Sequence, residues 1–536
     1  MTSPHSPQPA ALPPAAETAR RTSPETRPSR RGILSLGAGL LGIGALGACS
    51  VSTGTPGDVP AAQTPLSIDI PDPATPLPEA AATIGWMDNG NLKGPFIQAF
   101  HAAYQKKHPQ VTIDYTEAKW ATINESIPLA IRNGSAPDVF LLPNTVPRQV
   151  AVAEGWIAPL DDVVPGFAQW KEQLGEDVFI PGVEVFDGKT YTFPLSVSNG
   201  LNPTMFFDVQ RMEEAGVDPV GERLTWSGLR KVAADITRAG AGEYYGLLIG
   251  KDQLSSFTSA LAILAGAGTV GGMDYRSGQY AYESDEMVAA FELMLAMRDD
   301  GSLFPDYMSL TEATAAPRLA QRAAGMFFTG PYYIPQWQKD SPDFDFGVAA
   351  PPTGDDGAVH HVGYQPFGTD HLFLSADSAH PEIVGDMFAY IGSVEGQANL
   401  VAGSGGILMS VIDEANTLAE ERGDISEQGI AARSHANELM RIAPIPQTRN
   451  PQIAQVVMEM KAVKPALSDI AIGIMSGQIS DIRTALRDLD SASEQALDDA
   501  IAAARAKGAE VSREDYVFPT WDPSVDFGIA DYEADA

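Results

Sequence analysis

Hydrophobic and polar positions alternate along residues 191–195, with the period of a β-strand. Asp187–Gly188, a turn signal, precedes them, and a second strand-like run, Met205–Phe207, follows. The residues in between are mostly small or polar, and they include Ser198, Asn199 and Asn202. Two strands joined by a polar middle predict a crossing between two lobes. The polar middle is expected at the floor of the cleft between them.

Before this crossing, strand and helix patterns alternate. The pattern predicts strands over 82–86, 111–115 and 139–142, and helices over 94–108, 123–132 and 146–154. This alternation favours a mostly parallel sheet with helices on both faces. Ligands of such sheets bind at the carboxyl ends of the strands. Those ends carry Trp86–Asn89, Thr116–Glu117 and Pro143–Thr145.

After the crossing, the same reasoning predicts helices over 225–239, 285–300, 319–324 and 381–391, and strands over 325–328, 346–350 and 372–374. A second polar, aromatic-bearing stretch lies at Pro351–Tyr364, and a Gly-rich turn lies at Gly403–Gly406. We expect these to be two further crossings. The rest is mainly helical to about Lys507, followed by an acidic segment that contains Phe518, Trp521 and Phe527.

Composition changes the picture in two ways. The chain has 536 residues, 44% of them hydrophobic, which predicts a globular protein of two or more domains. The first 48 residues hold five basic and two acidic side chains, so the remainder carries a net charge of −37. Such a surface repels nucleic acid and anionic lipid, and we expect no nucleic-acid partner.

The amino terminus has the features of an export signal. Arg30–Arg31 precedes an apolar run, Ile33–Ala48, that is shorter than the ~20 residues needed to span a bilayer. The twin arginines resemble a twin-arginine export signal. Leu46–Cys49 resembles a bacterial lipobox, in which the cysteine is lipidated, and Cys49 is the only cysteine of the chain. The alternative is a buried, unmodified Cys49 in an N-terminal anchor helix.

The segment from Val51 to Ala81 is rich in proline and poor in apolar clusters, so we expect an extended tether. The predicted domains are a signal peptide with its extension at 1–49, a tether at 50–81, an N-terminal lobe at 82–195 and about 360–402, a C-terminal lobe at about 203–355 and 405–510, and an acidic aromatic tail at 511–536.

Several motifs, in order, resemble the family 1 extracellular solute-binding proteins of ABC importers, to which the maltose-binding protein belongs. They are Ser135–Phe140, Glu154–Asp161, Phe186–Pro194, Glu214–Val217 with Leu224–Trp226, Ala324–Pro331 and Ile474–Gln478. The resemblance covers most of Ala82 to about Leu497. It implies an α/β, two-lobe periplasmic-binding-protein-like fold of class II type, with three crossings, that closes on a ligand like a hinge.

The chain departs from the family pattern at three places. Ser227–Gly228 follows Thr225–Trp226, where acidic residues are usual. Leu142–Pro143 stands where the maltose-type site has an aromatic residue, and Ser198 or Asn199 stands in place of the usual carboxylate. These differences point to a ligand other than maltose.

Sugars present hydroxyl groups and flat C–H faces, so a sugar site needs aromatic rings and amide or carboxylate groups. Tyr332 matches the family's stacking aromatic after Gly-Pro. For every aromatic the alternative is core packing, and for every polar residue it is a turn or cap. The predicted ligand-binding residues are Trp86, Asp88, Asn89, Trp120, Asn144, Ser198, Asn199, Tyr332, Tyr333, Tyr364 and Gln365.

Three other functions stay open. Adjacent tyrosines with His360–His361 raise the possibility of ferric iron, although the carboxylate partners are not evident. A secreted carbohydrate-active enzyme is an alternative, but HExxH, GxSxG and P-loop motifs are absent from the sequence. A structural or receptor-type lipoprotein is the third.

We therefore predict a lipid-anchored, monomeric receptor on the outer face of the cell membrane. It would deliver a carbohydrate to ABC permease subunits by closure of two lobes around it. No catalytic residue, metal or cofactor is expected.

Replacing Cys49 by serine tests the anchor, because serine cannot take a thioether-linked lipid. We expect Cys49→Ser to move the protein from the membrane fraction to the soluble fraction, as judged by immunoblotting of fractionated cells. Retention of the variant in the membrane fraction would contradict the lipobox.

Overall fold

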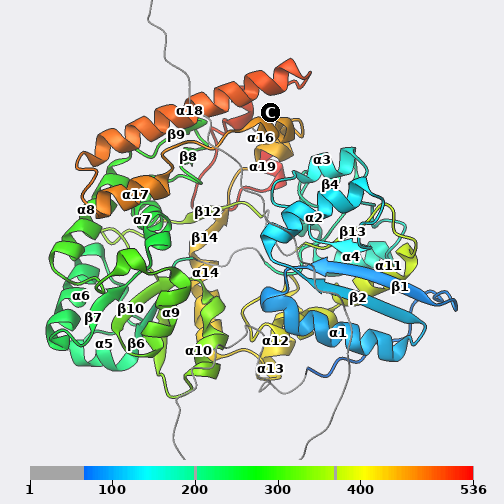
Figure 1. Ribbon diagram of the computed structural model, residues 1–536, viewed down its shortest axis with the longest axis horizontal. Helices are drawn as coiled ribbons and strands as arrows, with labels where there is room; N and C mark the ends of the chain where they lie inside the picture. Colours follow the sequence, from blue (N-terminus) through cyan, green and yellow to red (C-terminus); the bar gives the residue numbers. More distant parts are fainter. Residues whose placement is uncertain (1–65, 198–201, 367–370, 535–536) are drawn as a thin grey trace, which may run out of the picture. The chain divides into compact units, whose positions relative to one another are not determined.

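The computed structural model describes residues 66–197, 202–366 and 371–534, which all lie in one compact unit spanning residues 62–536. Its two largest sheets have four strands each (Figure 1). The first sheet contributes residues to one hydrophobic core, and the second sheet contributes residues to two others. The export signal residues Arg30 and Arg31, the proposed lipidation site Cys49, and the candidate residues Ser198 and Asn199 lie outside the described residues.

The first sheet has the strand order β13-β3-β1-β2. β1 (Ala82–Asp88) runs parallel to β2 (Val111–Glu117) and β3 (Val139–Phe140), while β13 (Phe373–Leu374) is antiparallel to β3. The mostly parallel sheet is therefore as expected. The helices of its core are α1 (Gly94–Lys107), α2 (Trp120–Arg132), α3 (Arg148–Ala153), α4 (Phe167–Leu174), α11 (Pro381–Ile391), α12 (Val394–Gly403) and α13 (Asp413–Glu421).

Helix α1 shows why the hydrophobic period predicted this lobe well. Phe96, Phe100 and Tyr104 recur every fourth residue, and all three are fully buried. Their spacing places them on one helical face against the sheet. The Tyr104 hydroxyl donates to Asp386 Oδ2 on α11 at 2.8 Å, which satisfies a buried carboxylate.

The second sheet has the order β11-β6-β10-β7. β6 (Thr204–Asp208) lies antiparallel between β11 (Phe346–Ala349) and β10 (Ala324–Thr329), and β7 (Tyr245–Leu248) is parallel to β10. The pairing of β6 with β10 sets Thr204 opposite Thr329. The helices packed around it are α5 (Val209–Ala215), α6 (Trp226–Gly240), α7 (Leu254–Ala262), α8 (Asp285–Asp299), α9 (Glu312–Ala320), α10 (Ile334–Asp340), α14 (Glu427–Leu439) and α17 (Leu467–Met475).

A smaller core forms near the carboxyl terminus. It contains the hairpin of β8 (Met273–Asp274) and β9 (Gln279–Tyr280), and the later part of α18 (Ile482–Ala506). β12 (Val362–Tyr364) pairs in parallel with β14 (Met440–Ile442) beside it. The same part of the chain also contains α15 (Pro446–Arg449), α16 (Ile453–Glu459), the short helix η7 (Arg513–Tyr516) and α19 (Ile529–Ala534).

The predicted strand at residues 191–195 is wrong. The turn at Asp187–Gly188 instead closes a hairpin of β4 (Val185–Phe186) and β5 (Lys189–Thr190). In residues 191–197, only Pro194 forms a β-bridge, and its partner is His371. Proline has no amide hydrogen to donate, which explains why the alternation of residue types does not become a ladder.

The chain passes between the two sheets near the predicted crossings, with one difference. The first passage lies between Leu195, in the first core, and β6, and the second lies between β11 and β13. At the predicted third crossing, a Cβ on Gly403 would lie 2.8 Å from the Phe96 side chain, so this residue still packs on the first lobe. The third passage follows α13, before α14.

The last part of the predicted tether packs on the first core. Ile70 is buried there, and Asp72 forms an ion pair with Lys107 of α1 at 2.6 Å. Residues 66–81 therefore lie against the lobe. In the described ranges, the structure contains no helix with the length and apolar character needed to cross a bilayer.

We expect the buried His101 of α1 to make the stability of the first lobe sensitive to acid. It is buried between the rings of Trp86 and Tyr115, and its ring nitrogens have no hydrogen-bond partner in the described part of the chain. Burial lowers its pKa from 6.5 to about 3. As the pH falls below 6.5, the unfolded state takes up a proton that the folded state refuses, so the free energy of unfolding falls.

We expect His101→Phe to flatten this acid dependence by about 1.4 kcal/mol per pH unit between pH 6 and pH 4. Urea unfolding across that range measures it. His380→Phe, at a partly exposed histidine that precedes α11, is the control. Equal pH slopes in wild type and His101→Phe would show that His101 does not cause the effect.

Candidate functional site

The end of β1 is held by a buried carboxylate. Asp88 accepts hydrogen bonds from Gly90 N at 2.6 Å, the Trp86 indole at 2.8 Å and the Tyr115 hydroxyl at 3.0 Å. Its side chain is fully buried. Three donors compensate the charge, so Asp88 fixes the geometry of the strand end.

Two neighbouring candidates also have local roles. Trp86 is 1% exposed, and its ring packs edge-on against His101 at 4.7 Å and Phe388 at 6.4 Å. Its position in the core matches the packing alternative. Asn89 is partly buried, and its side-chain oxygen accepts a hydrogen bond from the Lys93 ammonium group.

Trp120 and Asn144 line one cavity of about 610 Å³. Trp120 begins α2 after the end of β2, and Asn144 follows β3, where its backbone N–H donates to Asn124 Oδ1 at 2.9 Å. Asn144 therefore lies just beyond a strand end, as predicted, and Trp120 begins the helix that follows β2. The remaining lining residues come from both sides: Leu141, Leu142, Pro143, Thr145, Val146, Pro147, Arg148, Gln149, Gly182, His371 and Phe373 on the first lobe, and Gln447, Val457, Met458 and Met460 near the carboxyl terminus.

A buried chain of polar groups lies at this cavity. Arg148 Nη2 donates to His371 Nδ1 at 3.1 Å, and His371 Nε2 lies 2.8 Å from Glu184 Oε1. Because arginine only donates, His371 accepts at Nδ1 and carries its proton at Nε2. Arg148 also donates to Val183 O at 3.2 Å, and burial lowers its pKa to about 10. Glu184 accepts further from Ile180 N at 2.9 Å.

These three residues were missed by sequence reasoning, because nothing in their local patterns sets them apart. Their arrangement fixes the cavity wall and places one guanidinium group in it. Arg148 also lies over the Phe373 ring, 5.8 Å from its centroid.

A second polar cluster lies at the end of β10. The Tyr332 hydroxyl donates to Glu312 Oε1 and accepts from Asn202 Nδ2 at 3.3 Å. The Thr329 hydroxyl also donates to Glu312. Burial and the neighbouring Glu312 carboxylate raise the pKa of Tyr332 to about 12. Tyr332 is nevertheless 38% exposed, so the hydroxyl is fixed while much of the ring is open to solvent.

Of the other candidates on the second half of the chain, Tyr333 packs beside Tyr332, with ring centroids 5.0 Å apart, and Tyr364 and Gln365 belong to a different part of the fold. Tyr333 stacks on the buried Trp337 at 5.7 Å, and burial raises its pKa. Tyr364 belongs to β12, and burial raises its pKa to about 12. The Gln365 amide donates to the Tyr275 hydroxyl at 3.0 Å and to Pro444 O, which ties it to the C-terminal core.

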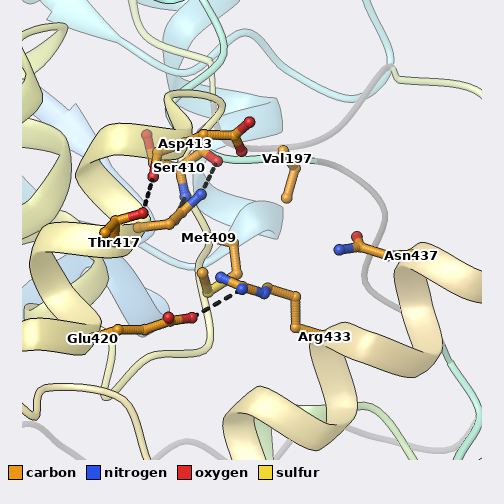
Figure 2. A pocket seen from close by; sticks show the side chains of 9 residues that line it. Val197, Met409, Ser410, Asp413, Thr417, Glu420, Arg433 and Asn437 are labelled. Carbon is orange, nitrogen blue, oxygen red and sulfur yellow. Dashed lines mark hydrogen bonds and ion pairs between the residues drawn. The ribbon is translucent and has the colours of Figure 1, made fainter.

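A smaller cavity of about 210 Å³ lies beside Val197, just before the first crossing (Figure 2). Arg433 of α14 reaches Glu420 of α13 across it, with Nη2 and Oε1 2.9 Å apart. Ser410 and Asn416 are bonded to each other at its wall. The polar groups that line this cavity therefore bond mostly to one another. In the described residues, no group of three His, Cys, Asp or Glu side chains is placed to hold a metal ion.

The profile of the bacterial extracellular solute-binding proteins matches residues 89–398, more than half of the chain. The chain belongs to this family. A binding protein of Brucella abortus strain 2308 is 26% identical over 290 residues. That match covers 54% of this solute-binding protein and 66% of its relative, slightly less than two thirds of the relative's length.

Solved structures share the fold. The GacH receptor of Streptomyces glaucescens, determined unliganded and with acarbose, is 19% identical, with a TM-score of 0.57, and covers 78% of this chain and 99% of its own. The sugar-binding protein MalE of Xanthomonas citri is 17% identical, with a TM-score of 0.57, over 80% of this chain and all of its own. UgpB of Mycobacterium tuberculosis, in complex with glycerophosphocholine, is 16% identical, with a TM-score of 0.57, over 78% and 98%. The two-lobe, periplasmic-binding-protein-like fold expected from the sequence is confirmed.

The buried polar chain at the cavity yields a stability prediction. Glu184→Gln removes the charge that faces His371 and Arg148, and it leaves the buried guanidinium poorly compensated. We expect a loss of about 3 kcal/mol in the free energy of unfolding. Urea unfolding measures it, with Glu172→Gln on the exposed surface of α4 as the control. An effect no larger than that of the control would contradict a structural role for this chain of contacts.

Proposed function

We propose that this solute-binding protein binds a carbohydrate between its two lobes and delivers it to the membrane subunits of an ABC importer. One observation carries the proposal. Of the aromatic residues in the described part of the chain, Tyr332 is the most exposed, at 38%. An aromatic ring open to solvent at a strand end is the group that stacks on the C–H face of a sugar.

The neighbours of Tyr332 suit the same ligand class. Asn202 supplies an amide and Glu312 a carboxylate, which are the groups that bind sugar hydroxyls. Because Glu312 already holds the Tyr332 hydroxyl, the ring is oriented before a ligand arrives. Trp120, partly exposed in the cavity of about 610 Å³, adds a second aromatic surface, and Asn144 adds an amide nearby.

The ligands bound in structural neighbours support this class. GacH was solved with acarbose, and RafE was solved with raffinose. Glycerophosphocholine, the ligand of UgpB, represents a different chemistry and belongs in any screen. Ser198 and Asn199 stay candidates for the crossing side of the site, and Tyr333, Tyr364 and Gln365 are secondary ones. Trp86, Asp88 and Asn89 would act by supporting the edge of the site.

Closure supplies the mechanism. A ligand that contacts both lobes stabilises the closed form by the difference between its affinities for the two forms. The permease would recognise that closed form. No step of this cycle requires catalysis. The twin-arginine signal would direct export of the receptor. The lipid on Cys49 would then hold it at the outer face of the membrane, where the importer takes up its substrate.

A melting-temperature screen of the full chain tests the ligand class. The panel is maltose, maltotriose, raffinose, acarbose and glycerophosphocholine. Stabilisation follows RT ln(1 + [L]/Kd), or ~2.7 kcal/mol at a hundredfold excess over Kd. We expect at least one carbohydrate to raise the melting temperature. A shift with glycerophosphocholine alone, or no shift with any sugar, would contradict the proposal.

Substitution of Tyr332 locates the site. With a sugar that stabilises the wild type, we expect Tyr332→Ala to weaken binding by roughly tenfold, or ~1.4 kcal/mol. Tyr332→Phe keeps the ring and should cost less than about fivefold. Val220→Ala, at another exposed apolar residue, is the control. Isothermal titration measures all three, and equal affinity of Tyr332→Ala and wild type would move the site away from Tyr332.

A further inference from the structure

The acidic segment at the carboxyl terminus is folded into the molecule. Its aromatic residues join the small C-terminal core, where Phe518 meets Phe527 at 5.5 Å and Phe527 meets Tyr532 at 4.9 Å between ring centroids. Trp521 packs against Tyr275 at 5.9 Å. The composition of the segment does not predict this packing, because its apolar residues are interspersed among acidic ones.

This segment is bonded to several parts of the chain, and one of them is residues 441–450. Phe527 N donates to Ile442 O at 2.9 Å, and Ile442 N donates to Asp526 Oδ1 at 2.6 Å. Ile445 N donates to the Tyr532 hydroxyl at 2.7 Å. Side chains of residues 441–450 donate further bonds to the segment: the Arg441 guanidinium to Ser524 O, the Arg449 guanidinium to Val517 O, and the Asn450 amide to Asp515 Oδ1.

The braced stretch also contacts the first lobe. Thr448 donates its hydroxyl hydrogen to Pro181 O at 2.6 Å. Gln447 lies against Gly182, where an added Cβ would be 3.1 Å from the Gln447 carbonyl oxygen. Both Gln447 and Gly182 line the cavity of about 610 Å³. One side of that cavity is therefore closed by a contact between residues 181–182 and residues 447–448.

Tyr532 links these two sets of contacts. Its hydroxyl accepts from Ile445 N at 2.7 Å, and Ile445 O in turn accepts from Thr448 N at 2.9 Å. The contacts therefore run from Tyr532 to Ile445, from Ile445 to the Thr448 backbone, and from the Thr448 hydroxyl to Pro181 on the first lobe.

We propose that residues 511–534 are a positioning element of the ligand cavity, and that Tyr532 is its key residue. By bracing residues 441–450, this segment fixes the wall that carries Gln447 and the contact that joins it to the first lobe. The role in binding rests on the proposed function, because it assumes that a ligand occupies this cavity. The segment itself touches no ligand; it sets the shape of the wall that does.

Hydrogen exchange of the full chain tests the positioning without any ligand. We expect Tyr532→Phe to accelerate exchange about five- to tenfold in two regions, residues 441–450 and residues 180–185. The second region lies in the other lobe, so a merely structural role in the C-terminal core would leave its exchange unchanged. Tyr516→Phe makes the same chemical change in the same core, at a residue that none of these contacts uses, and it should alter neither region.

Faster exchange in residues 441–450 with unchanged exchange in residues 180–185 would overturn the proposal. If Tyr532→Phe fails to fold, Thr448→Val decides the matter, since it leaves residues 511–534 intact and removes only the bond to Pro181. Exchange in residues 180–185 should then rise, and its constancy would show that the contact positions nothing.

The binding arm uses raffinose and maltotriose. For whichever of them raises the melting temperature of the wild type, we expect Tyr532→Phe to weaken binding about fivefold while Tyr516→Phe leaves it unchanged. Unchanged affinity in Tyr532→Phe would overturn the effect of the segment on the ligand. If neither sugar binds the wild type, the proposed ligand class fails, whereas the exchange experiment still decides the positioning.

Discussion

The pairing of β6 with β10 determines where the candidate site lies. Their antiparallel register sets Thr204 opposite Thr329, so the chain that enters β6 lies beside the chain that leaves β10. The first of these segments carries Asn202 and the second carries Tyr332. A slip of one residue would turn the side chains of either strand to the opposite face and separate these groups. All four residues of β6 that pair with β10 are buried, which makes such a slip costly.

The two lobes use polar residues at their strand ends differently. At the end of β1, Asp88 is enclosed by three donors and has no surface left for a ligand. At the end of β10, Glu312 binds two hydroxyls but leaves the Tyr332 ring exposed. Enclosed groups give a rigid edge, and partly open groups can exchange a contact with water for one with a ligand. This difference favours the second lobe as the source of the aromatic contact.

Local pattern predicted most helices and strands, because burial on one face imposes a period that the sequence must show. Helix α1 and the strands β1, β2 and β10 were all located from such periods. The predicted strand at residues 191–195 failed because an alternation of residue types does not supply a partner with free hydrogen-bonding groups. β7 (Tyr245–Leu248) was not predicted.

The candidate site was harder to predict for a related reason. The strand-end rule identifies the edge of a sheet, but it does not say which side chains turn inward. Trp86 lies near the end of β1 and Trp120 begins the helix after β2, yet the first is buried in the core and the second lines the cavity. The contacts between Arg148, His371 and Glu184 join residues that are 223 and 187 positions apart. Such contacts depend on the tertiary fold, so a single sequence carries no local signal for them.

The packing of the carboxyl-terminal segment also depends on the tertiary fold. Its acidic composition suggests a solvated tail, but Phe518, Trp521 and Phe527 are buried in a common core. Buried aromatic rings hold the segment in place, and its backbone and side-chain bonds transmit that position to residues 441–450. The hydrophobic effect supplies most of the stabilisation, while directional hydrogen bonds determine the register of the wall. The cavity wall at residues 441–450 is built from the end of a three-residue strand and a four-residue helix, which are too short to fix their position alone. Its geometry therefore depends on the segment that packs behind it, which explains how residues far from the ligand can set the shape of its site.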